Sequence, residues 1–277
     1  MKIEFSKMHG LGNDFVVIDA IHQLINLTAE QIRGIADRHF GVGCDQLLLV
    51  EKPVSVNADF KYRIFNADGG EVAQCGNGAR CFARFIRENN LSQKDRIVVD
   101  TNAGQLVLSI EKSGLVTVDM GVPRHDPAQI PLLKSEESKL YSVALVEAGQ
   151  VEFAALSMGN PHAVIQVKDV TSAPLQTIGA QLEKHPIFPE RANIGFMQVV
   201  DRGEIKLRVY ERGAGETQAC GSGACAAVVA GIEQGLLDND VSVGLPGGEL
   251  KIHWTGRGQS VFMTGPAVLV YQGQIVI

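Results

Sequence analysis

The chain has 277 residues, of which 45% are hydrophobic and 20% charged, a composition typical of a folded protein. Its net charge of -6 argues against a surface for nucleic acid or for an anionic membrane. No run of about 18 apolar residues and no signal-peptide pattern occurs, so we expect a cytoplasmic protein with no membrane partner. Its five cysteines are then expected to be free thiols.

The first half of the chain predicts short strands interrupted by two helices. Residues 15–19, 46–50, 61–65 and 105–109 are rich in β-branched or alternating apolar residues, which favours strands. A capping box at Thr28 and Gln31 predicts a helix that buries Ile32, Ile35 and Ala36. A second helix is predicted from about Asn77. Its apolar face consists of Ala79, Phe82, Ala83 and Ile86.

The second half opens on residues 123–140, where three prolines and a charged stretch predict a surface connection. Residues 204–210 predict a strand. A helix follows from about Ser222 and is apolar on every side, which indicates a helix enclosed by protein rather than one in a membrane. Sheets curled around central helices satisfy this pattern. The predicted fold class is therefore α/β (or α+β).

An internal repeat indicates two related domains. Residues 66–86 align without gaps on residues 211–231, with identical Gly, Glu, Cys, Gly, Gly and Ala positions that pair Cys75 with Cys220. Residues 12–19 match residues 159–166 at nearly the same spacing. We therefore predict two pseudo-symmetric domains that divide near Gly121 and Pro123, with the active site in the cleft between them.

Each copy of the repeat places Cys-Gly-x-Gly-Ala at the start of a predicted helix. A helix N-terminus carries partial positive charge and unpaired N–H groups, so it binds a carboxylate and is expected to lower the pKa of a thiol there. Inversion of a carbon that bears hydrogen needs a base on one face and an acid on the other. We therefore predict that Cys75 and Cys220 invert a stereocentre as a two-base pair.

A cysteine beside glycine at one helix start is often only a small residue in a tight turn, but its recurrence in both copies favours function. Cys81 and Cys225 fall inside the predicted helices and are expected to pack there, and Cys44 is expected to be structural. No metal-ligand spacing, dinucleotide fingerprint or phosphate loop is present. We therefore expect neither a metal nor a cofactor.

Five stretches of the sequence resemble the diaminopimelate epimerase family, a branch of the cofactor-independent, two-cysteine amino-acid racemases and epimerases. The stretches are Lys7-Met-His-Gly-Leu-Gly-Asn-Asp-Phe15, Phe65-Asn-Ala-Asp-Gly69 with Gln74-Cys-Gly-Asn-Gly-Ala-Arg-Cys81, Ser157-Met-Gly-Asn-Pro-His162, Glu190-Arg-Ala-Asn-Ile-Gly195, and Tyr210-Glu-Arg-Gly-Ala-Gly-Glu-Thr-Gln-Ala-Cys-Gly-Ser-Gly223. They follow the family's order and span essentially the whole chain.

The resemblance implies interconversion of LL- and meso-diaminopimelate for lysine and peptidoglycan synthesis, without a cofactor. It implies domains of residues 1–120 with 266–277 and of residues 121–265, each with a largely antiparallel curled sheet around a helix. The implied catalytic residues are Cys75, Cys220, His162 and Glu211. The implied substrate contacts are Asn13, Gln46, Asn66, Gly76, Asn77, Asn160, Asn193, Glu211, Arg212, Gly221 and Ser222. A homodimer with Tyr271 at its interface is also implied.

The chemistry of these residues agrees with that implication. Arg212 offers a fork for the distal carboxylate of the substrate, and Glu211 can meet an ammonium group. His162 is expected to tune one thiol, with Glu211 near the other.

Two other interpretations remain open. One is a related two-base epimerase of hydroxyproline or a phenazine-type isomerase, although the latter lacks paired cysteines. The other is a thiol redox or binding protein in which Cys75 and Cys220 form a disulfide.

Overall fold

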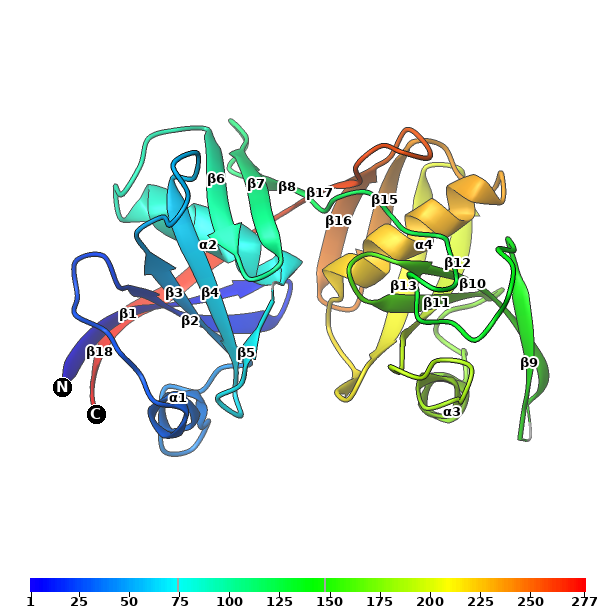
Figure 1. Cartoon of the computed structure of the whole chain (residues 1–277), viewed down its shortest axis with the longest axis horizontal. Helices are drawn as coiled ribbons and strands as arrows, with labels where there is room; N and C mark the ends of the chain where they lie inside the picture. The colour runs from blue at the N-terminus through cyan, green and yellow to red at the C-terminus, as the bar shows by residue number, and fades with distance from the viewer. Residues whose placement is uncertain (74, 147) are drawn as a thin grey trace. The chain divides into compact units, whose positions relative to one another are not determined.

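The computed structural model describes residues 1–73, 75–146 and 148–277, so Gln74 of the second motif lies outside the described residues. Contacts among Cα atoms divide the chain into two compact units. Unit 1 consists of Met1–Asp119 and Thr264–Ile277, and unit 2 consists of Met120–Met263. In each unit of Figure 1, one long helix lies among strands. The fold is mixed α/β and consists mostly of strands, as predicted.

Unit 1 is built on a mixed sheet. Its strands are β1 (Lys2–Gly10), β2 (Asn13–Asp19), β3 (Gln46–Glu51), β4 (Phe60–Asn66), β5 (Glu71–Val72), β6 (Arg96–Thr101), β7 (Gly104–Ile110), β8 (Val116–Asp119) and β18 (Val268–Val276). β1 pairs antiparallel with both β18 and β2, β3 with β4, β4 with β5, β6 with β7, and β7 with β8. Two pairs are parallel, β2 with β3 and β4 with β6. The predicted strands of this half are confirmed.

Each parallel pair in unit 1 is connected through a helix. Between β2 and β3 lies α1 (Ala29–Ala36), where the Thr28 capping box is present and Ile32, Ile35 and Ala36 are buried, as predicted. Between β4 and β6 lies α2 (Gly76–Glu88). The predicted apolar face of α2 is buried, and so is Arg80. The helix packs against β1, β2, β3, β7 and β8, so the strands enclose it.

Unit 2 repeats this arrangement. Its strands are β9 (Tyr141–Leu145), β10 (Gly149–Ser157), β11 (Pro161–Gln166), β12 (Asn193–Asp201), β13 (Glu204–Glu211), β14 (Gly215–Glu216), β15 (Asp240–Leu245) and β16 (Gly248–His253), while β17 (Phe262–Gly265) crosses the boundary between the units. β11 pairs parallel with β12, and β13 with β15. β12 pairs antiparallel with β13, and β15 with β16. This is the order of pairings from β2 to β7.

The central helix of unit 2 is α4 (Gly221–Glu233), which follows the short β14 as α2 follows β5. Ten of its residues, from Gly221 to Gly231, are buried, so the prediction of an enclosed helix is confirmed. The short η1 (Leu175–Gly179) and α3 (Ala180–Glu183) take the place of α1. The prediction that residues 123–140 form a surface connection is wrong in part. Ile130 and Leu132 are buried in the hydrophobic core of this unit, in the same cluster as strand residues such as Phe153.

Candidate active site

The first predicted cysteine lies at the N-terminus of α2. Cys75 is the N-cap residue, with an extended backbone at φ -146 and ψ 124, and its side chain is half-buried. The hydroxyl of Tyr62 on β4 donates to the carbonyl oxygen of Cys75 at 3.2 Å. This bond ties the helix start to the sheet.

Amide side chains surround this helix start. Oδ1 of Asn13 lies 3.8 Å from Sγ of Cys75 and accepts a hydrogen bond from Nδ2 of Asn77 at 3.2 Å. Gln46 and Asn66 face each other across β3 and β4, and their carboxamides are hydrogen-bonded at 2.9 Å. The predicted contact residues of the first half, Asn13, Gln46, Asn66, Gly76 and Asn77, thus gather at one end of the sheet of unit 1, where α2 begins.

The second predicted cysteine occupies the matching place in unit 2. Cys220 is the N-cap of α4, again with an extended backbone, and its side chain is 5% exposed. Its Sγ lies 3.7 Å from Oγ of Ser222, to which Nδ2 of Asn160 donates at 3.4 Å. Asn160 matches Asn13 in the upstream repeat. Asn13 contacts its cysteine directly, whereas Asn160 reaches Cys220 through Ser222.

Burial sets the protonation state of Cys220. It raises the pKa of the thiol well above its usual value, and the carboxylate of Glu211 raises it further. Hydrogen bonds from Ser222 and from the backbone of Gly223 act in the opposite direction but do not compensate. The prediction that the helix N-terminus lowers this pKa is therefore wrong for Cys220, because desolvation penalises a thiolate more than the helix end stabilises it.

Glu211 is the carboxylate of the second half-site. It ends β13 and accepts a hydrogen bond from the hydroxyl of Thr217. It also accepts a hydrogen bond from the thiol of Cys220, which favours the protonated thiol. Thr217 was not identified from the sequence, although it lies in the fifth motif. The sequence gives only a weak signal for Thr217, because hydroxyl side chains are common in turns.

His162 is placed differently from the sequence-based expectation. Its ring is 1% exposed, and Nε2 forms a 3.0 Å hydrogen bond with Oδ1 of Asn160. Burial, followed by the charge of Arg212, lowers the pKa of His162 to about 3, so the ring is neutral. The hydrogen-bonded path from His162 to Cys220 runs through Asn160 and Ser222, so His162 contacts the asparagine rather than a thiol.

Asn193 and Arg212 form the outer part of the second half-site. Asn193 is buried, and its carboxamide binds backbone groups: Oδ1 accepts from the N–H of Arg212 at 2.9 Å, and Nδ2 donates to the carbonyl of Pro161 at 3.3 Å. The guanidinium of Arg212 is exposed and donates to the carbonyl of Glu190 at 3.0 Å. Asn193 therefore fixes the backbone from which the Arg212 fork projects.

The glycines of the repeat have packing roles. A Cβ on Gly78 would lie 2.7 Å from the hydroxyl oxygen of Tyr62, and one on Gly223 would lie 3.1 Å from Sγ of Cys220. Both distances are shorter than normal van der Waals contacts. The second glycine of Cys-Gly-x-Gly thus lets the helix start approach its strand and its cysteine.

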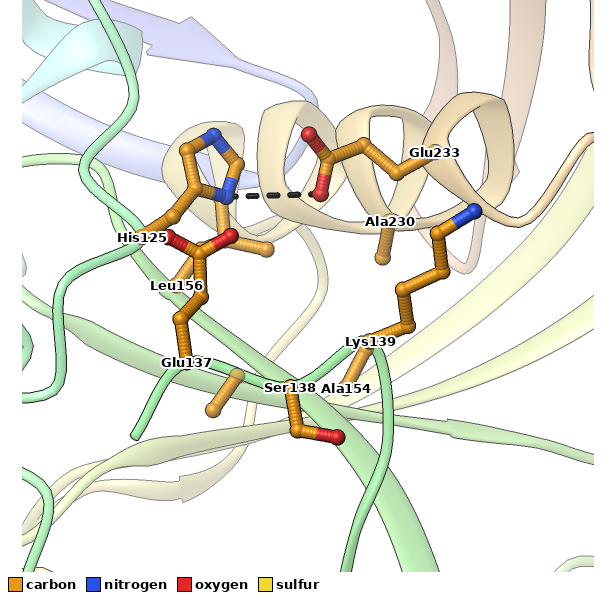
Figure 2. A pocket seen from close by; sticks show the side chains of 9 residues that line it. His125, Glu137, Ser138, Lys139, Ala154, Leu156, Ala230 and Glu233 are labelled. Carbon is orange, nitrogen blue, oxygen red and sulfur yellow. Dashed lines mark ion pairs between the residues drawn. The ribbon is translucent and has the colours of Figure 1, made fainter. Parts of the chain in front are cut away.

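A separate hollow in unit 2 contains none of the predicted residues (Figure 2). Nδ1 of His125 lies 3.5 Å from the carboxylate of Glu233 on α4, and Arg257 forms ion pairs with both Glu233 and Glu137. These charges attach the 123–140 segment to α4. Among the residues that the structure describes, no group of three or more His, Cys, Asp or Glu side chains is arranged to hold a metal ion, and no helix is long and apolar enough to cross a membrane.

The sequence model of the diaminopimelate epimerase family matches residues 5–125 and 154–270. The chain belongs to the diaminopimelate epimerase family. It is 60% identical over 280 residues to a diaminopimelate epimerase of Thioalkalivibrio sulfidiphilus, with 100% of both chains covered. It is 58% identical over 275 residues to one of Nitrosomonas europaea, with 99% of both chains covered.

Solved structures share the fold of this epimerase-family chain at much lower identity. A phenazine biosynthesis protein of Bacillus anthracis is 17% identical with a TM-score of 0.70, and all of both chains is covered. A hydroxyproline epimerase of Agrobacterium vitis is 16% identical with the same TM-score, covering 99% of this chain and 92% of that one. At such identities the likeness shows the fold alone. The family match therefore separates the diaminopimelate interpretation from the two related alternatives.

Proposed function

We propose that this protein interconverts LL- and meso-diaminopimelate, and that Cys75 and Cys220 move the proton at the α-carbon. Membership of the diaminopimelate epimerase family supports the reaction. One structural observation supports the residues: each cysteine is the N-cap of the central helix in its unit. Equivalent asparagines lie near both, Asn13 in contact with the Cys75 thiol and Asn160 linked to Cys220 through Ser222. The protein is then an isomerase whose reaction serves lysine and peptidoglycan synthesis.

In the proposed mechanism the two half-sites act on one α-carbon. A thiolate on one face takes the α-proton as the C–H bond breaks, and the thiol on the other face gives its proton to the carbanion. The unpaired N–H groups at the starts of α2 and α4 stabilise negative charge on the substrate carboxylate. The roles of the thiols are exchanged after each turnover, so the reaction runs in both directions.

Glu211 has a defined part in this scheme. Because its carboxylate accepts a hydrogen bond from the Cys220 thiol, it can take the thiol proton when Cys220 has to act as a base. We propose that Arg212 binds the distal carboxylate of the substrate. The remaining predicted contacts, including Gly76 and Gly221, supply neutral hydrogen bonds. A site of this kind rejects substrates without distal charges, because its polar groups would be left unpaired.

The decisive experiment follows deuterium at the α-carbon by NMR. Reduced protein is incubated with LL-diaminopimelate in D₂O with EDTA and without pyridoxal phosphate. We expect exchange and formation of the meso isomer, both abolished or crippled in Cys75→Ala and Cys220→Ala. Cys81→Ala is the matched control, since burial in the same helix raises the pKa of that thiol to about 12. A folded, reduced wild-type protein that exchanges no proton would refute the proposal.

We further propose that the protein acts in the cytoplasm as a homodimer that buries β18. Tyr271 on this strand is 46% exposed and packs edge-on against Phe5 with ring centroids 6.1 Å apart, and Val268 and Val270 are exposed beside it. Sedimentation equilibrium tests this proposal. Wild-type protein should sediment as a dimer, and Tyr271→Ala should have a larger dimer dissociation constant. A monomeric wild type would contradict the proposed homodimer.

A further inference from the structure

A chain of hydrogen bonds in unit 1 runs from a buried arginine to an exposed aspartate. Nη2 of Arg80 donates to Oδ1 of Asn77 at 2.9 Å, Nδ2 of Asn77 donates to Oδ1 of Asn13 at 3.2 Å, and Nδ2 of Asn13 donates to Oδ2 of Asp45 at 2.9 Å. Oδ1 of Asp45 accepts from Arg38 at 2.7 Å. The two carboxamides thus lie between a guanidinium and a carboxylate.

The ends of this chain fix its direction. A guanidinium only donates and an ionised carboxylate only accepts, whereas a carboxamide can do both. The oxygen of Asn77 must therefore face Arg80, and the NH₂ of Asn13 must face Asp45. The orientation of both amides follows from their partners, as an amide assignment requires. A flip of either carboxamide would set donor against donor or acceptor against acceptor.

The direction of these hydrogen bonds determines which atom of Asn13 faces the sulfur of Cys75. With its NH₂ held by Asp45, Asn13 can present only its oxygen to the sulfur, 3.8 Å away. An oxygen acceptor stabilises the protonated thiol, whereas an NH₂ group would stabilise the thiolate. The aspartate is itself anchored: Oδ2 of Asp45 also accepts from the backbone N–H of Asp14 at 3.0 Å, and Arg38 forms an ion pair with both Asp45 and Asp14.

We propose that Asp45 is a positioning residue that holds the Asn13 carboxamide with its oxygen towards Cys75. The inference deepens the proposed function, on which the catalytic role of Cys75 depends. Asp45 touches neither the thiol nor, in this scheme, the substrate. It acts through Asn13, and Arg80 acts through Asn77 from the other end. By holding Asn13 in this orientation, Asp45 keeps Cys75 in the protonated form that donates a proton to the substrate.

The test uses Asp45→Ala and Asp45→Asn, because the side chain of Asp45 is 44% exposed and its replacement leaves the core intact. Alanine removes the acceptor, so the Asn13 amide can rotate and present its NH₂ to sulfur. Asparagine removes the charge but can still offer an oxygen. Asp100→Ala is the matched control: this carboxylate also holds a loop, but it accepts from the backbone N–H groups of Val54 and Ser55 and from Gln105 rather than from Asn13.

The first readout is the alkylation rate of Cys75 at fixed pH, followed by peptide mass spectrometry. Cys44, Cys81, Cys220 and Cys225 are buried, so Cys75 is the accessible thiol of the described chain. We expect about tenfold faster alkylation in Asp45→Ala, the size of one hydrogen bond to a charged group. Asp45→Asn and Asp100→Ala should stay within about threefold of wild type.

The second readout is kcat/KM for epimerisation, which should fall about 10–100-fold in Asp45→Ala and be largely rescued by Asp45→Asn. An unchanged alkylation rate in folded Asp45→Ala would overturn the inference. Equal acceleration in Asp45→Ala and Asp45→Asn would also overturn it, because charge rather than orientation would then be responsible. Alkylation needs no substrate, so a wild type that fails to epimerise diaminopimelate would refute the proposed function without deciding this inference.

Discussion

The buried Cys220 thiol lies beside the half-buried Glu211 carboxylate, and only one of the two groups can readily carry a charge. Burial penalises the thiolate first, and the neighbouring carboxylate adds repulsion. The thiol therefore holds its proton while Glu211 accepts a hydrogen bond from it. Transfer of that proton to Glu211 would generate the thiolate at the moment when the substrate needs a base, without a permanently charged sulfur.

Replacement of Glu211 by glutamine tests this proton transfer. The amide keeps the size of the side chain but cannot take the thiol proton, so kcat for epimerisation should fall by at least about 10²-fold. Glu216→Gln makes the same chemical change nearby, at a carboxylate that pairs with Arg208, and should leave kcat nearly unchanged. Initial rates of meso-isomer formation measure both variants. A Glu211→Gln enzyme within threefold of wild type would contradict the role.

His162 gives unit 2 a pH-dependent stability. Its pKa falls from 6.5 to about 3 because of burial and then Arg212, so between these pH values the unfolded chain binds a proton that the folded chain does not. The free energy of unfolding should therefore fall by up to about 1.4 kcal/mol per pH unit below pH 6.5. Urea unfolding at pH 7, 5.5 and 4.5 should show a smaller loss in His162→Gln. Equal slopes would contradict the assignment.

At the scale of single residues, the sequence predicted which residues lie at the candidate site, but it did not predict their protonation states. Cys75, Cys220 and the pair Asn13 and Asn160 were identifiable because they recur in the internal repeat. Other amides, such as Asn66 and Asn193, were implied by the stretches that resemble the family. The high pKa of Cys220 depends on burial in the folded chain and on the nearby Glu211 carboxylate. The role of Asp45 depends on contacts with Asn13 and Asp14, 32 and 31 residues away, which no local pattern indicates.

At the scale of elements, the starts of the two central helices are held close to their strands by glycine. In α2, Gly78 has a buried environment in which a Cβ would meet the Tyr62 hydroxyl at 2.7 Å and Phe15 at 3.2 Å. In α1, Gly34 is exposed, and a Cβ there would have nothing within 4 Å. The same residue type thus has a packing role in one helix and none in the other.

This contrast predicts opposite effects of one substitution. Gly78→Ala should lower the free energy of unfolding by about 1–3 kcal/mol through overpacking. It should also reduce activity, because Tyr62 holds the carbonyl of Cys75. Gly34→Ala should raise the free energy of unfolding by about 0.5–1 kcal/mol through helix propensity. Urea unfolding and epimerisation rates measure the pair. Equal stability changes in the two variants would show that the close packing of Gly78 is unimportant.

Elements were predictable where their pattern is local. The capping box located α1, and the apolar periodicity gave the buried face of α2. The parallel pairs, β2 with β3 and β4 with β6, were not predicted, since pairing depends on crossovers through a helix rather than on the strands themselves. Residues 123–140 were misjudged because prolines and charges obscured Ile130 and Leu132, which reach the core.

At the scale of the whole molecule, unit 1 is assembled from both ends of the chain. β18 pairs with β1 from Lys2 opposite Val276 to His9 opposite Val268, and Ile277 donates to the carbonyl of Met1 at 2.9 Å. The carbonyl of Pro266 accepts from Nε of Arg80 in α2 at 3.2 Å. Figure 1 shows the two ends of the chain side by side in this unit. The last segment thus completes both the sheet and the surroundings of the α2 helix.

Deletion of residues 266–277 should therefore unfold unit 1 while unit 2, a continuous segment with its own core, stays folded. The deletion leaves β1 without its β18 neighbour and removes the Pro266 carbonyl that accepts from buried Arg80. Loss of one partner of a buried hydrogen bond costs about 1–3 kcal/mol. Hydrogen exchange should show protection lost in α2 and retained in α4, together with loss of epimerisation.

The matched control is a circular permutant in which residues 266–277 precede Met1 through a short glycine linker, which the adjacent ends allow. The permutant restores every contact of the strand but not its covalent link to Gly265, so it should recover α2 protection and most of the activity. Retained α2 protection in the deletion variant would show that unit 1 is complete without its last strand.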